Sequence, residues 1–370
     1  MILAVLFAAL SPIGALAAID TFANTTVYDP GDANVKVSYA RTETTTNNTI
    51  IAAWSDLQAN SSISIYRSAD NGFSWYAFGT ATSDVAGRRL VQPHLLYVNE
   101  TFGDYDAGTV LLAVNAVDDK STNIEIYASG DLGETFALVS TVATGGKANT
   151  TNGATPVWEP FLLLNNHKII CYYSDQRDPQ HGQKLSHQTT SEDFDSWGSA
   201  IDDVAFQNYT DRPGMTTVAK LPNGQFILTF EYAQPKPGGS AGENTYPIYY
   251  KLSNDPENFG TAPAQRLVVD TGARPNGGPY VTWTPLGGTG GTVVVSDSDS
   301  NSIFVNTNEG AGNWTEVKTP AGRAYSREVR VPSNDNGKLR ITGGAEYDQQ
   351  GPSLITATVM DLSKALNITQ

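Results

Sequence analysis

The sequence contains one cysteine in 370 residues and few basic side chains. Because Cys171 has no second cysteine to pair with, an intrachain disulfide is excluded, and stability must come from packing of the core. The 23 Lys and Arg residues face 38 Asp and Glu residues, which gives a formal net charge of −15. Nucleic acids and anionic membrane surfaces attract basic patches, so this balance argues against both as partners. A neutral partner fits this charge better than a polyanion.

Several familiar motifs are also missing. The sequence has no H-E-x-x-H zinc motif, no Walker loop and no dinucleotide fingerprint. Hydrolysis that needs neither a cofactor nor a metal is the simplest chemistry left. Beyond the first 18 residues, no apolar run is long enough to cross a bilayer.

The N-terminal apolar run, residues 1–18, ends in Ala15-Leu16-Ala17. An apolar run that ends in small residues is typical of a secretory signal peptide, although this one lacks a basic start; a buried first strand or helix is the alternative. Asn-x-Ser/Thr sequons support secretion. They begin at Asn24, Asn47, Asn60, Asn99, Asn149, Asn208, Asn313 and Asn367. We therefore expect a secreted, extracellular protein in which residues 19–370 form a single catalytic domain.

Glycine and proline are abundant, with 34 and 19 residues, which favours strands and turns over helices. A fourteen-residue block recurs, as SISIYRSADNGFSW at 62–75 and NIEIYASGDLGETF at 123–136. Weaker copies occupy residues 184–197, 246–259 and 301–314. In the strong copies, Ser-x-Asp-x-Gly-x-Ser/Thr-aromatic predicts a tight turn whose Asp accepts backbone N–H groups. Asp70 and Asp131 lack the spacing of metal ligands, so we interpret them as structural.

An apolar strand precedes each block, and a Pro-marked strand precedes most of these strands in turn. The apolar strands lie at 49–56, 109–116, 168–175, 225–233 and 291–298, with a sixth at 338–347. Six units of about four strands each predict an all-β fold, a six-bladed β-propeller forming one closed domain. The last unit lacks a fourth strand, which the segment near Thr25-Thr26-Val27 can supply.

Comparing the repeats with one another singles out two carboxylates. Aligning the Pro-marked strands places Glu159 opposite Gln92, and aligning the next strands places Glu231 opposite Ser55 and Ser174. Two carboxylates held across a cleft are typical of glycoside hydrolysis, in which one protonates the leaving oxygen and the other attacks or activates water. A salt-bridged structural role for Glu159 is the alternative.

Other side chains suit a carbohydrate-binding cleft, since aromatic rings stack on sugars and arginines bind hydroxyls or orient carboxylates. The substrate-binding candidates are Arg41, His94, Trp158, Arg212, Tyr232, Arg274, Tyr325 and Arg327. Any single aromatic residue is more commonly a core residue than a sugar platform. Asp297 and Asp299 alternate at a strand end, and we expect both to be solvated.

Two kinds of motif carry a family resemblance. The turn blocks resemble the Asp-boxes of sialidase-like propellers. VWEPFLLL around Glu159, TFEYA around Glu231, DRPG at 211–214 and RPNGGP at 274–279 resemble fungal exo-α-1,5-L-arabinanases of glycoside hydrolase family 93. The resemblance implies a secreted monomer that cuts linear arabinan, the side chains of pectin, from the non-reducing end. It further implies release of arabinobiose with retention, and catalysis by both glutamates.

The resemblance leaves the division of roles open. Glu159 lies between Trp158 and Pro160-Phe161, and desolvation there favours a neutral carboxyl, so we assign it as general acid and Glu231 as nucleophile. One alternative function is an exo-sialidase that uses Arg41, Arg274, Arg327, Tyr325 and Glu231. The other is a non-catalytic propeller that binds glycans. The Gly/Pro-rich loop at 233–247 is a candidate for the wall that closes the groove at one end.

Overall fold

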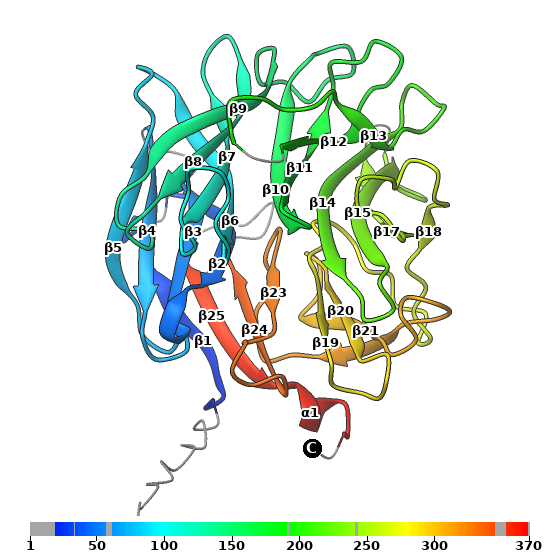
Figure 1. The fold of residues 1–370 in the computed structure, drawn as a ribbon. Helices are drawn as coiled ribbons and strands as arrows, with labels where there is room; N and C mark the ends of the chain where they lie inside the picture. Colours follow the sequence, from blue (N-terminus) through cyan, green and yellow to red (C-terminus); the bar gives the residue numbers. More distant parts are fainter. Residues whose placement is uncertain are drawn as a thin grey trace, which may run out of the picture.

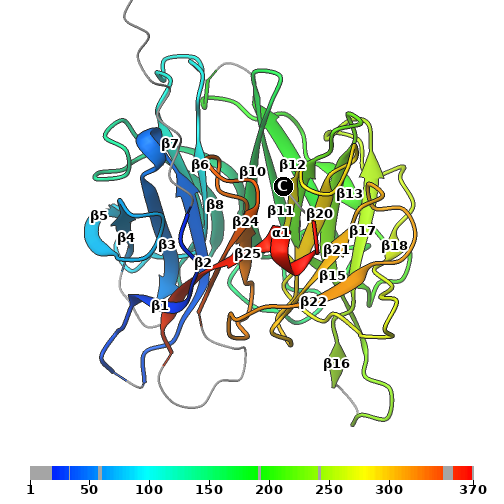
Figure 2. The ribbon, with the colours of Figure 1, turned by 90° about the horizontal axis from the view of Figure 1, so that it is seen from below.

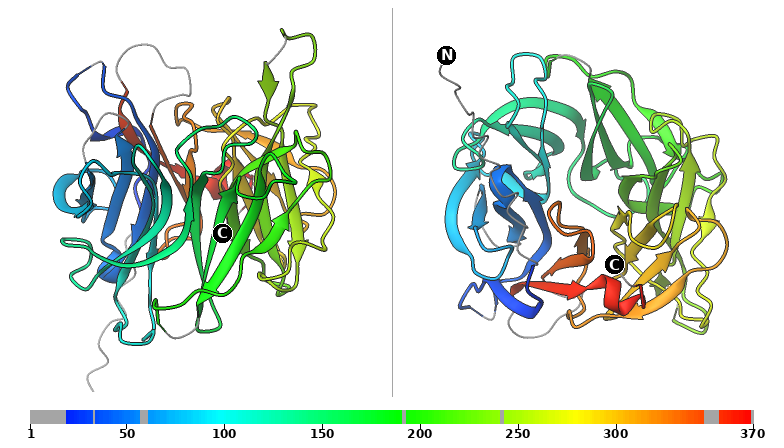
Figure 3. Two further views of the ribbon diagram at one scale, coloured as in Figure 1. Left: turned by 90° about the horizontal axis from the view of Figure 1, so that it is seen from above. Right: turned by 60° about the horizontal axis from the view of Figure 1, so that its bottom comes forward.

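The computed structural model describes residues 19–32, 34–56, 61–190, 193–240, 243–344 and 353–368. In these ranges the strands form six antiparallel sheets around a central axis (Figures 1 and 3), so the predicted six-bladed β-propeller is confirmed. The expected signal peptide, residues 1–18, lies outside the described residues. No helix in the described ranges is both long and apolar enough to span a membrane.

The first three blades each consist of four consecutive strands, with the inner strand first. Blade 1 contains β2 (Val37–Thr44), β3 (Ile50–Asp56), β4 (Ser62–Ser68) and β5 (Tyr76–Thr82), with the short 3-10 helix η1 (Thr46–Asn48) between its first two strands. Blade 2 contains β6 (Arg89–Tyr97), β7 (Val110–Val117), β8 (Thr122–Ser129) and β9 (Ala137–Gly145). Blade 3 contains β10 (Val157–Asn165), β11 (Lys168–Asp175), β12 (Lys184–Thr190) and β13 (Ile201–Val204).

The other three blades depart from this plan in two places. Blade 4 contains β14 (Arg212–Lys220), β15 (Phe226–Pro235), β17 (Ile248–Ser253) and β18 (Gln265–Arg266), and a fifth strand, β16 (Asn244–Thr245), pairs with the end of β15. Blade 5 contains β19 (Val281–Thr284), β20 (Thr292–Ser296), β21 (Ser302–Asn306) and β22 (Thr315–Lys318). Blade 6 contains β23 (Glu328–Arg330), β24 (Lys338–Gly343), β25 (Ile355–Asp361) and β1 (Phe22–Tyr28), and the helix α1 (Leu362–Ala365) follows β25.

The ring is closed by pairing of the two ends of the chain. β1 is the outer strand of blade 6 and runs antiparallel to β25, with Thr25 opposite Ala357 and Phe22 opposite Val359. This confirms the prediction that the N-terminal segment completes the last unit. Closure leaves the outer edge of β25 paired rather than open to another chain.

The two strong turn blocks form the predicted tight turns. In the first, the Asp70 carboxylate accepts hydrogen bonds from Ser68 Oγ at 2.8 Å and from the Ser74 N–H at 2.9 Å. Gly72 has a φ of 96°, a conformation that glycine adopts without steric cost. Trp75 donates its indole N–H to the Gly72 carbonyl at 2.8 Å, which packs the ring onto the turn. Asp70 is therefore saturated by its own turn, consistent with a structural role.

The core lies between the blades. Between blades 1 and 2, Ile51 and Ile65 pack in one cluster with Leu95 and Leu112, and all four side chains are at most 1% exposed. Such packing of neighbouring sheets buries most of the apolar surface, the main stabilising contribution in a fold without a disulfide. It also fixes the inner strands around the axis, where the candidate site lies.

Candidate active site

Each of the first four inner strands is interrupted by a β-bulge at the same level of the propeller. The bulges lie between Ser38 and Arg41, Val91 and His94, Trp158 and Phe161, and Gly214 and Thr217. The first residue of every bulge has a positive φ, namely Tyr39 (54°), Gln92 (53°), Glu159 (61°) and Met215 (61°). A positive φ costs a non-glycine residue roughly 1–3 kcal/mol. Because a bulge changes the direction of the side chains in its strand, the four strained residues can point toward the propeller axis.

The bulges also connect neighbouring blades by hydrogen bonds. The Gln92 N–H of blade 2 donates to Ser55 Oγ of blade 1 at 2.6 Å. In the same way, the Gly278 N–H ahead of blade 5 donates to Glu231 Oε2 of blade 4 at 2.7 Å. Glu231 thus occupies the place that a serine holds in blade 1, as the repeat comparison indicated. Each carboxylate thus accepts a backbone N–H from the next blade or the loop before it.

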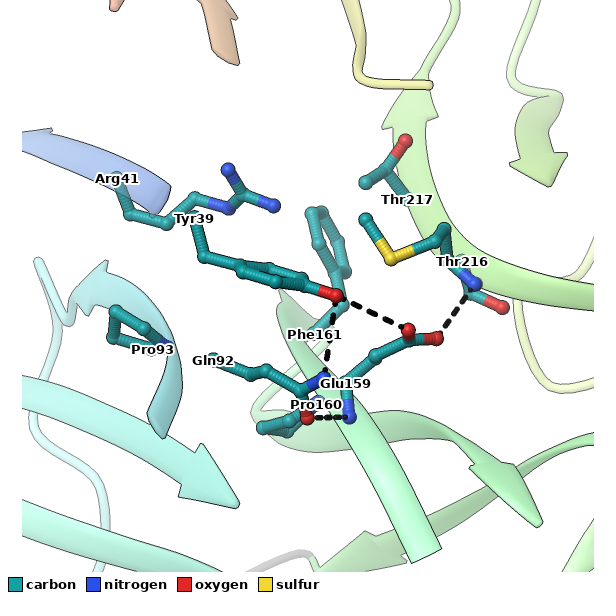
Figure 4. A pocket seen from close by; sticks show the side chains of 10 residues that line it. Tyr39, Arg41, Gln92, Pro93, Glu159, Pro160, Phe161, Thr216 and Thr217 are labelled. Atoms are coloured by element: carbon teal, nitrogen blue, oxygen red, sulfur yellow. Dashed lines mark hydrogen bonds between the residues drawn. The ribbon is translucent and has the colours of Figure 1, made fainter. Parts of the chain in front are cut away.

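The Glu159 carboxylate is surrounded by hydrogen-bond donors from three other strands. Its Oε2 accepts from the Met215 N–H and from Ser174 Oγ, both at 2.9 Å, and its Oε1 lies 3.5 Å from the Tyr39 hydroxyl (Figure 4). Burial raises the pKa of Glu159, while these donors and the positive charge of Arg212 oppose the rise. Donors to a carboxylate favour its ionised form.

The Glu231 carboxyl has a different environment. Its side chain is nearly buried, with 9% of the residue exposed. Burial, followed by the negative charge of Glu159, raises its pKa to about 8, and the Gly278 N–H and the Tyr325 hydroxyl offset only part of this. A carboxyl with this pKa is mostly protonated at neutral pH, as a general acid must be.

Gly214 separates the two carboxylates. A Cβ atom built on this residue would lie 3.5 Å from Glu159 Oε2 and 3.6 Å from Glu231 Oε1, so both oxygens border the same small space. The cavity at this point is lined by residues of blades 1 to 4 (Figure 4). These are Tyr39, Arg41, Gln92, Pro93, Glu159, Pro160, Phe161, Met215, Thr216 and Thr217. In the described ranges no group of three His, Cys, Asp or Glu side chains is arranged to hold a metal ion.

The structure brings two of the predicted substrate-binding residues to the cavity. Arg41 lines it, but its guanidinium donates to the carbonyls of Ala40 and Ser326 at 2.8 Å and lies 5.0 Å from the Tyr280 ring centroid. Tyr325 lies beside the cavity, with its ring edge-on to Tyr39 at 5.4 Å between centroids. The Arg41 guanidinium is therefore used mainly to hold neighbouring backbone in place and has few donors left for a sugar.

Two further candidates, Arg212 and Trp158, lie near Glu159 but do not line the cavity. Arg212 donates to Gln176 Oε1 at 3.0 Å, to Gln183 Oε1 at 2.7 Å and to Asn152 Oδ1 at 2.8 Å. The half-buried Trp158 donates its indole N–H to the same Gln176 oxygen at 2.9 Å. Most Arg212 donors are thus used within the protein, and its side chain ties together the loops on this side of the site.

The structure places four of the predicted substrate-binding residues away from the cavity: His94, Tyr232, Arg274 and Arg327. His94 is 3% exposed, accepts the Leu162 N–H on Nδ1 at 3.1 Å and packs on Phe161, so the expectation that it lines the mouth was wrong. Tyr232 stacks on Phe206 with ring centroids 4.6 Å apart. Arg274 is exposed and does not line the cavity.

Arg327 does not lie where it could contact a substrate in the cavity. Instead it forms a buried pair with Asp297, which is therefore not solvated. Both are 1% exposed, and their charged groups lie 3.8 Å apart. The expectation of a solvated Asp297 was therefore wrong, because the residue accepts hydrogen bonds from Ser300 Oγ at 2.7 Å and from the Asn276 N–H at 3.2 Å inside blade 5. Asp299, two positions further, is exposed as expected.

Sequence comparison of the repeats missed Tyr39 and the Met215 N–H. The inner strand of blade 1 has no proline, so it was not aligned with the Pro-marked strands, where Tyr39 corresponds to Gln92 and Glu159. The contribution of Met215 is a backbone group, which no residue identity reveals. Gln92 was noted only as the neutral counterpart of Glu159.

Comparison of the sequence with protein-family models and with curated protein sequences found no match. Comparison of the structure did. The NanB sialidase of Streptococcus pneumoniae superimposes with a TM-score of 0.62 at 10% identity, over 92% of this chain and 71% of that one, which shows a sialidase-like fold alone.

Two fungal enzymes are much more similar. An α-L-arabinanase of Penicillium chrysogenum, solved with arabinobiose, is 40% identical with a TM-score of 0.88, over 94% of this chain and 99% of that one. The GH93 α-L-arabinofuranosidase of Fusarium graminearum, also solved with arabinobiose, is 38% identical with a TM-score of 0.89 and the same coverage. With this identity along the whole propeller and a carboxylate pair at its axis, the chain belongs to glycoside hydrolase family 93.

Proposed function

We propose that this enzyme cleaves linear α-1,5-L-arabinan from the non-reducing end and releases arabinobiose with retention of configuration. The carrying observation is the pair of carboxyl groups beside Gly214, one with a pKa of about 8 and the other surrounded by donors. The relatives solved with arabinobiose support an arabinan chain as the substrate. A neutral polysaccharide also suits a chain with a net charge of −15.

In this proposal Glu231 is the general acid and base, and Glu159 is the nucleophile. This reverses the assignment made from the sequence. Trp158 and Pro160 flank Glu159 in the chain, but the bulge turns its carboxylate away from them toward Ser174 and the Met215 N–H. Those donors favour the anion that a nucleophile requires, while burial and the neighbouring charge keep the proton on Glu231.

The reaction then has two displacements. First, the Glu159 carboxylate attacks the anomeric carbon, the bond to the leaving oxygen breaks, and Glu231 gives that oxygen its proton. Second, Glu231 takes a proton from water, the water oxygen attacks the anomeric carbon, and the bond to Glu159 breaks. Each displacement inverts the anomeric carbon, so the product retains the original configuration.

Action at the chain end needs a wall at one end of the groove. β15 continues from Glu231 into the hairpin with β16, which projects from the body of the propeller (Figures 2 and 3). The hairpin is anchored to the loop before blade 5, because Asn276 Oδ1 accepts from the Tyr246 N–H at 2.6 Å and from Thr245 Oγ1 at 2.8 Å. This position supports the hairpin as the wall.

We also propose that the enzyme is secreted as a monomer after removal of residues 1–18. The apolar run ending in small residues supports this. Several sequon asparagines are exposed, as glycan attachment requires: Asn24, Asn99, Asn149, Asn208, Asn313 and Asn367. N-terminal sequencing, a glycosidase mobility shift and light scattering of the protein from the culture medium would test these points.

The substrate is tested by incubating the enzyme with linear arabinan and separating the products over time. We expect arabinobiose as the only early product, with the α anomer formed first by NMR. Release of a ladder of oligomers would contradict chain-end action, and first formation of the β anomer would contradict retention. If the enzyme released nothing from arabinan but released free sialic acid from a sialoside, the sialidase alternative would be supported. That outcome is disfavoured because a sialidase needs three arginines, and Arg41 is the only arginine that lines the described cavity.

A further inference from the structure

Three side chains beside Glu159 form a connected chain of contacts with no assigned task. The Tyr39 hydroxyl lies 3.5 Å from Glu159 Oε1, and Gln92 Nε2 lies 3.3 Å from the same hydroxyl (Figure 4). Gln92 Oε1 in turn accepts from Asn115 Nδ2 at 3.1 Å. All three come from blades 1 and 2, whereas the carboxylates belong to blades 3 and 4.

The orientation of the Gln92 amide follows from its neighbours. Its oxygen accepts both the Asn115 side-chain amide and the Glu159 backbone N–H, each at 3.1 Å. Both partners are donors, so the NH₂ end of Gln92 must face Tyr39. The Tyr39 oxygen then accepts from Gln92, and its own hydrogen is available for the Glu159 carboxylate.

Tyr39 also keeps its proton. Burial, followed by the negative charge of Glu159, raises the pKa of Tyr39 well above its usual value. Its ring packs edge-on against Tyr325, whose hydroxyl also hydrogen-bonds to it. The phenol is therefore a permanent donor, held on one side by Gln92 and on the other by Tyr325. Its contact with Glu159 is long, as catalytic hydrogen bonds often are before the substrate is bound.

We propose that Tyr39 is a positioning residue that donates a hydrogen bond to Oε1 of the nucleophile Glu159, with Gln92 and Asn115 fixing the direction of the donor. The inference rests on the proposed function, in which Glu159 attacks the sugar. The Met215 N–H and Ser174 bind the other oxygen, Oε2. Tyr39 adds a donor to Oε1, so both oxygens of the Glu159 carboxylate have donors. These donors stabilise the ionised carboxylate before it attacks the sugar and again when its bond to the sugar breaks.

The first test is the Tyr39→Phe variant, which removes the hydroxyl and keeps the ring packed on Tyr325. Without this donor the Glu159 anion is less stable and its pKa rises, so the acidic limb of the pH profile of kcat/KM moves to higher pH. We expect kcat to fall by about ten-fold or more, as for loss of a hydrogen bond to a charged group, with little change in KM. Gln92→Met should shift the same limb in the same direction.

Tyr66→Phe is the matched control, because it deletes a hydroxyl from β4, outside the residues that line the cavity. It should leave the pH profile and kcat unchanged. If Tyr39→Phe lowered the thermal midpoint but left the acidic limb and kcat where they are in the wild type, its role would be merely structural and the inference would be overturned.

A second measurement does not depend on the substrate. The pKa of Glu159 is read by NMR from ¹³C-carboxyl-labelled glutamate, with the Glu159 signal assigned by its loss in Glu159→Gln. A higher Glu159 pKa in Tyr39→Phe than in the wild type supports the inference, and an identical titration overturns it. If the wild type released no sugar from arabinan, the proposed function would fail. The titration would still show whether Tyr39 donates a hydrogen bond to Glu159.

Discussion

Glu159 and Glu231 are the same residue type on adjacent blades, yet their surroundings differ, and the proposed mechanism gives them opposite tasks. Glu159 Oε2 accepts two hydrogen bonds at 2.9 Å, whereas Glu231 accepts one backbone N–H at 2.7 Å and carries the repulsion of its neighbour. Two carboxylates this close do not both ionise readily, and hydrogen-bond donors favour the charged form. The hydrogen-bond donors around each carboxyl group therefore support the proposed roles.

Azide rescue tests this division. In Glu159→Ala the cavity gains room and loses its nucleophile, so we expect activity to drop by at least about 10³-fold and azide to restore it with an inverted arabinobiosyl azide as product. In Glu231→Ala we expect azide to attack the glycosyl-enzyme and give the retained azide. Configurations are assigned by NMR. The opposite pairing of variant and configuration would restore the sequence-based assignment.

The pH dependence of activity follows from the raised pKa of Glu231. Because the general acid must carry a proton, kcat/KM on arabinan should fall as the pH rises through about 8. An arabinobioside with a nitrophenol leaving group needs little protonation, so its alkaline limb should be weaker. Equal alkaline limbs for the two substrates would show that another group causes the loss of activity.

At the scale of elements, the β-bulge is the unit that builds the site. A regular strand alternates its side chains between two faces, and one inserted residue changes which side chains reach the axis. The bulge in β10 presents Glu159 at positive φ and returns Phe161 to the core, where it meets His94 of the preceding blade. The same shift explains why His94, two positions after Gln92, is buried.

Gly214, next to the bulge in β14, is predicted to be essential because of the space it leaves. In Gly214→Ala the new methyl would stand 3.5 Å from Glu159 Oε2, 3.6 Å from Glu231 Oε1 and 3.1 Å from Gln183 Nε2. We expect kcat/KM to fall by about 10²-fold through displacement of the carboxylates, with a small change in thermal midpoint. Gly130→Ala is the control, since a Cβ at Gly130 would meet nothing within 4 Å, and it should keep full activity.

At the scale of the whole molecule, the propeller depends on closure by its own first strand. β1 pairs with β25, and its Val27 is 3% exposed in a cluster with Val37 and Trp54 of blade 1. Removing it would expose this apolar surface and an unpaired strand edge. The destabilisation would affect blade 6, whose first strand, β23, begins shortly after Tyr325.

We therefore expect a chain beginning at residue 29 to have a thermal midpoint several degrees or more below that of a chain beginning at residue 19, and to self-associate through the open edge. Differential scanning calorimetry and size-exclusion chromatography at several concentrations would compare the two. Equal midpoints and elution volumes would show that β1 does not contribute to closure.

The propeller could be predicted from the sequence alone, because each blade is a local unit whose strands and turn block repeat in the chain. The sequence also identified Glu159 and Glu231, since each departs from a neutral residue at the same place in sister repeats. The different surroundings of the two carboxyl groups became visible in the three-dimensional arrangement alone, because the donors around Glu159 and Glu231 come from other strands and other blades. The tertiary structure likewise brought Tyr39 to Glu159 and buried His94 and Asp297, since a bulge changes the facing of a strand without changing its composition.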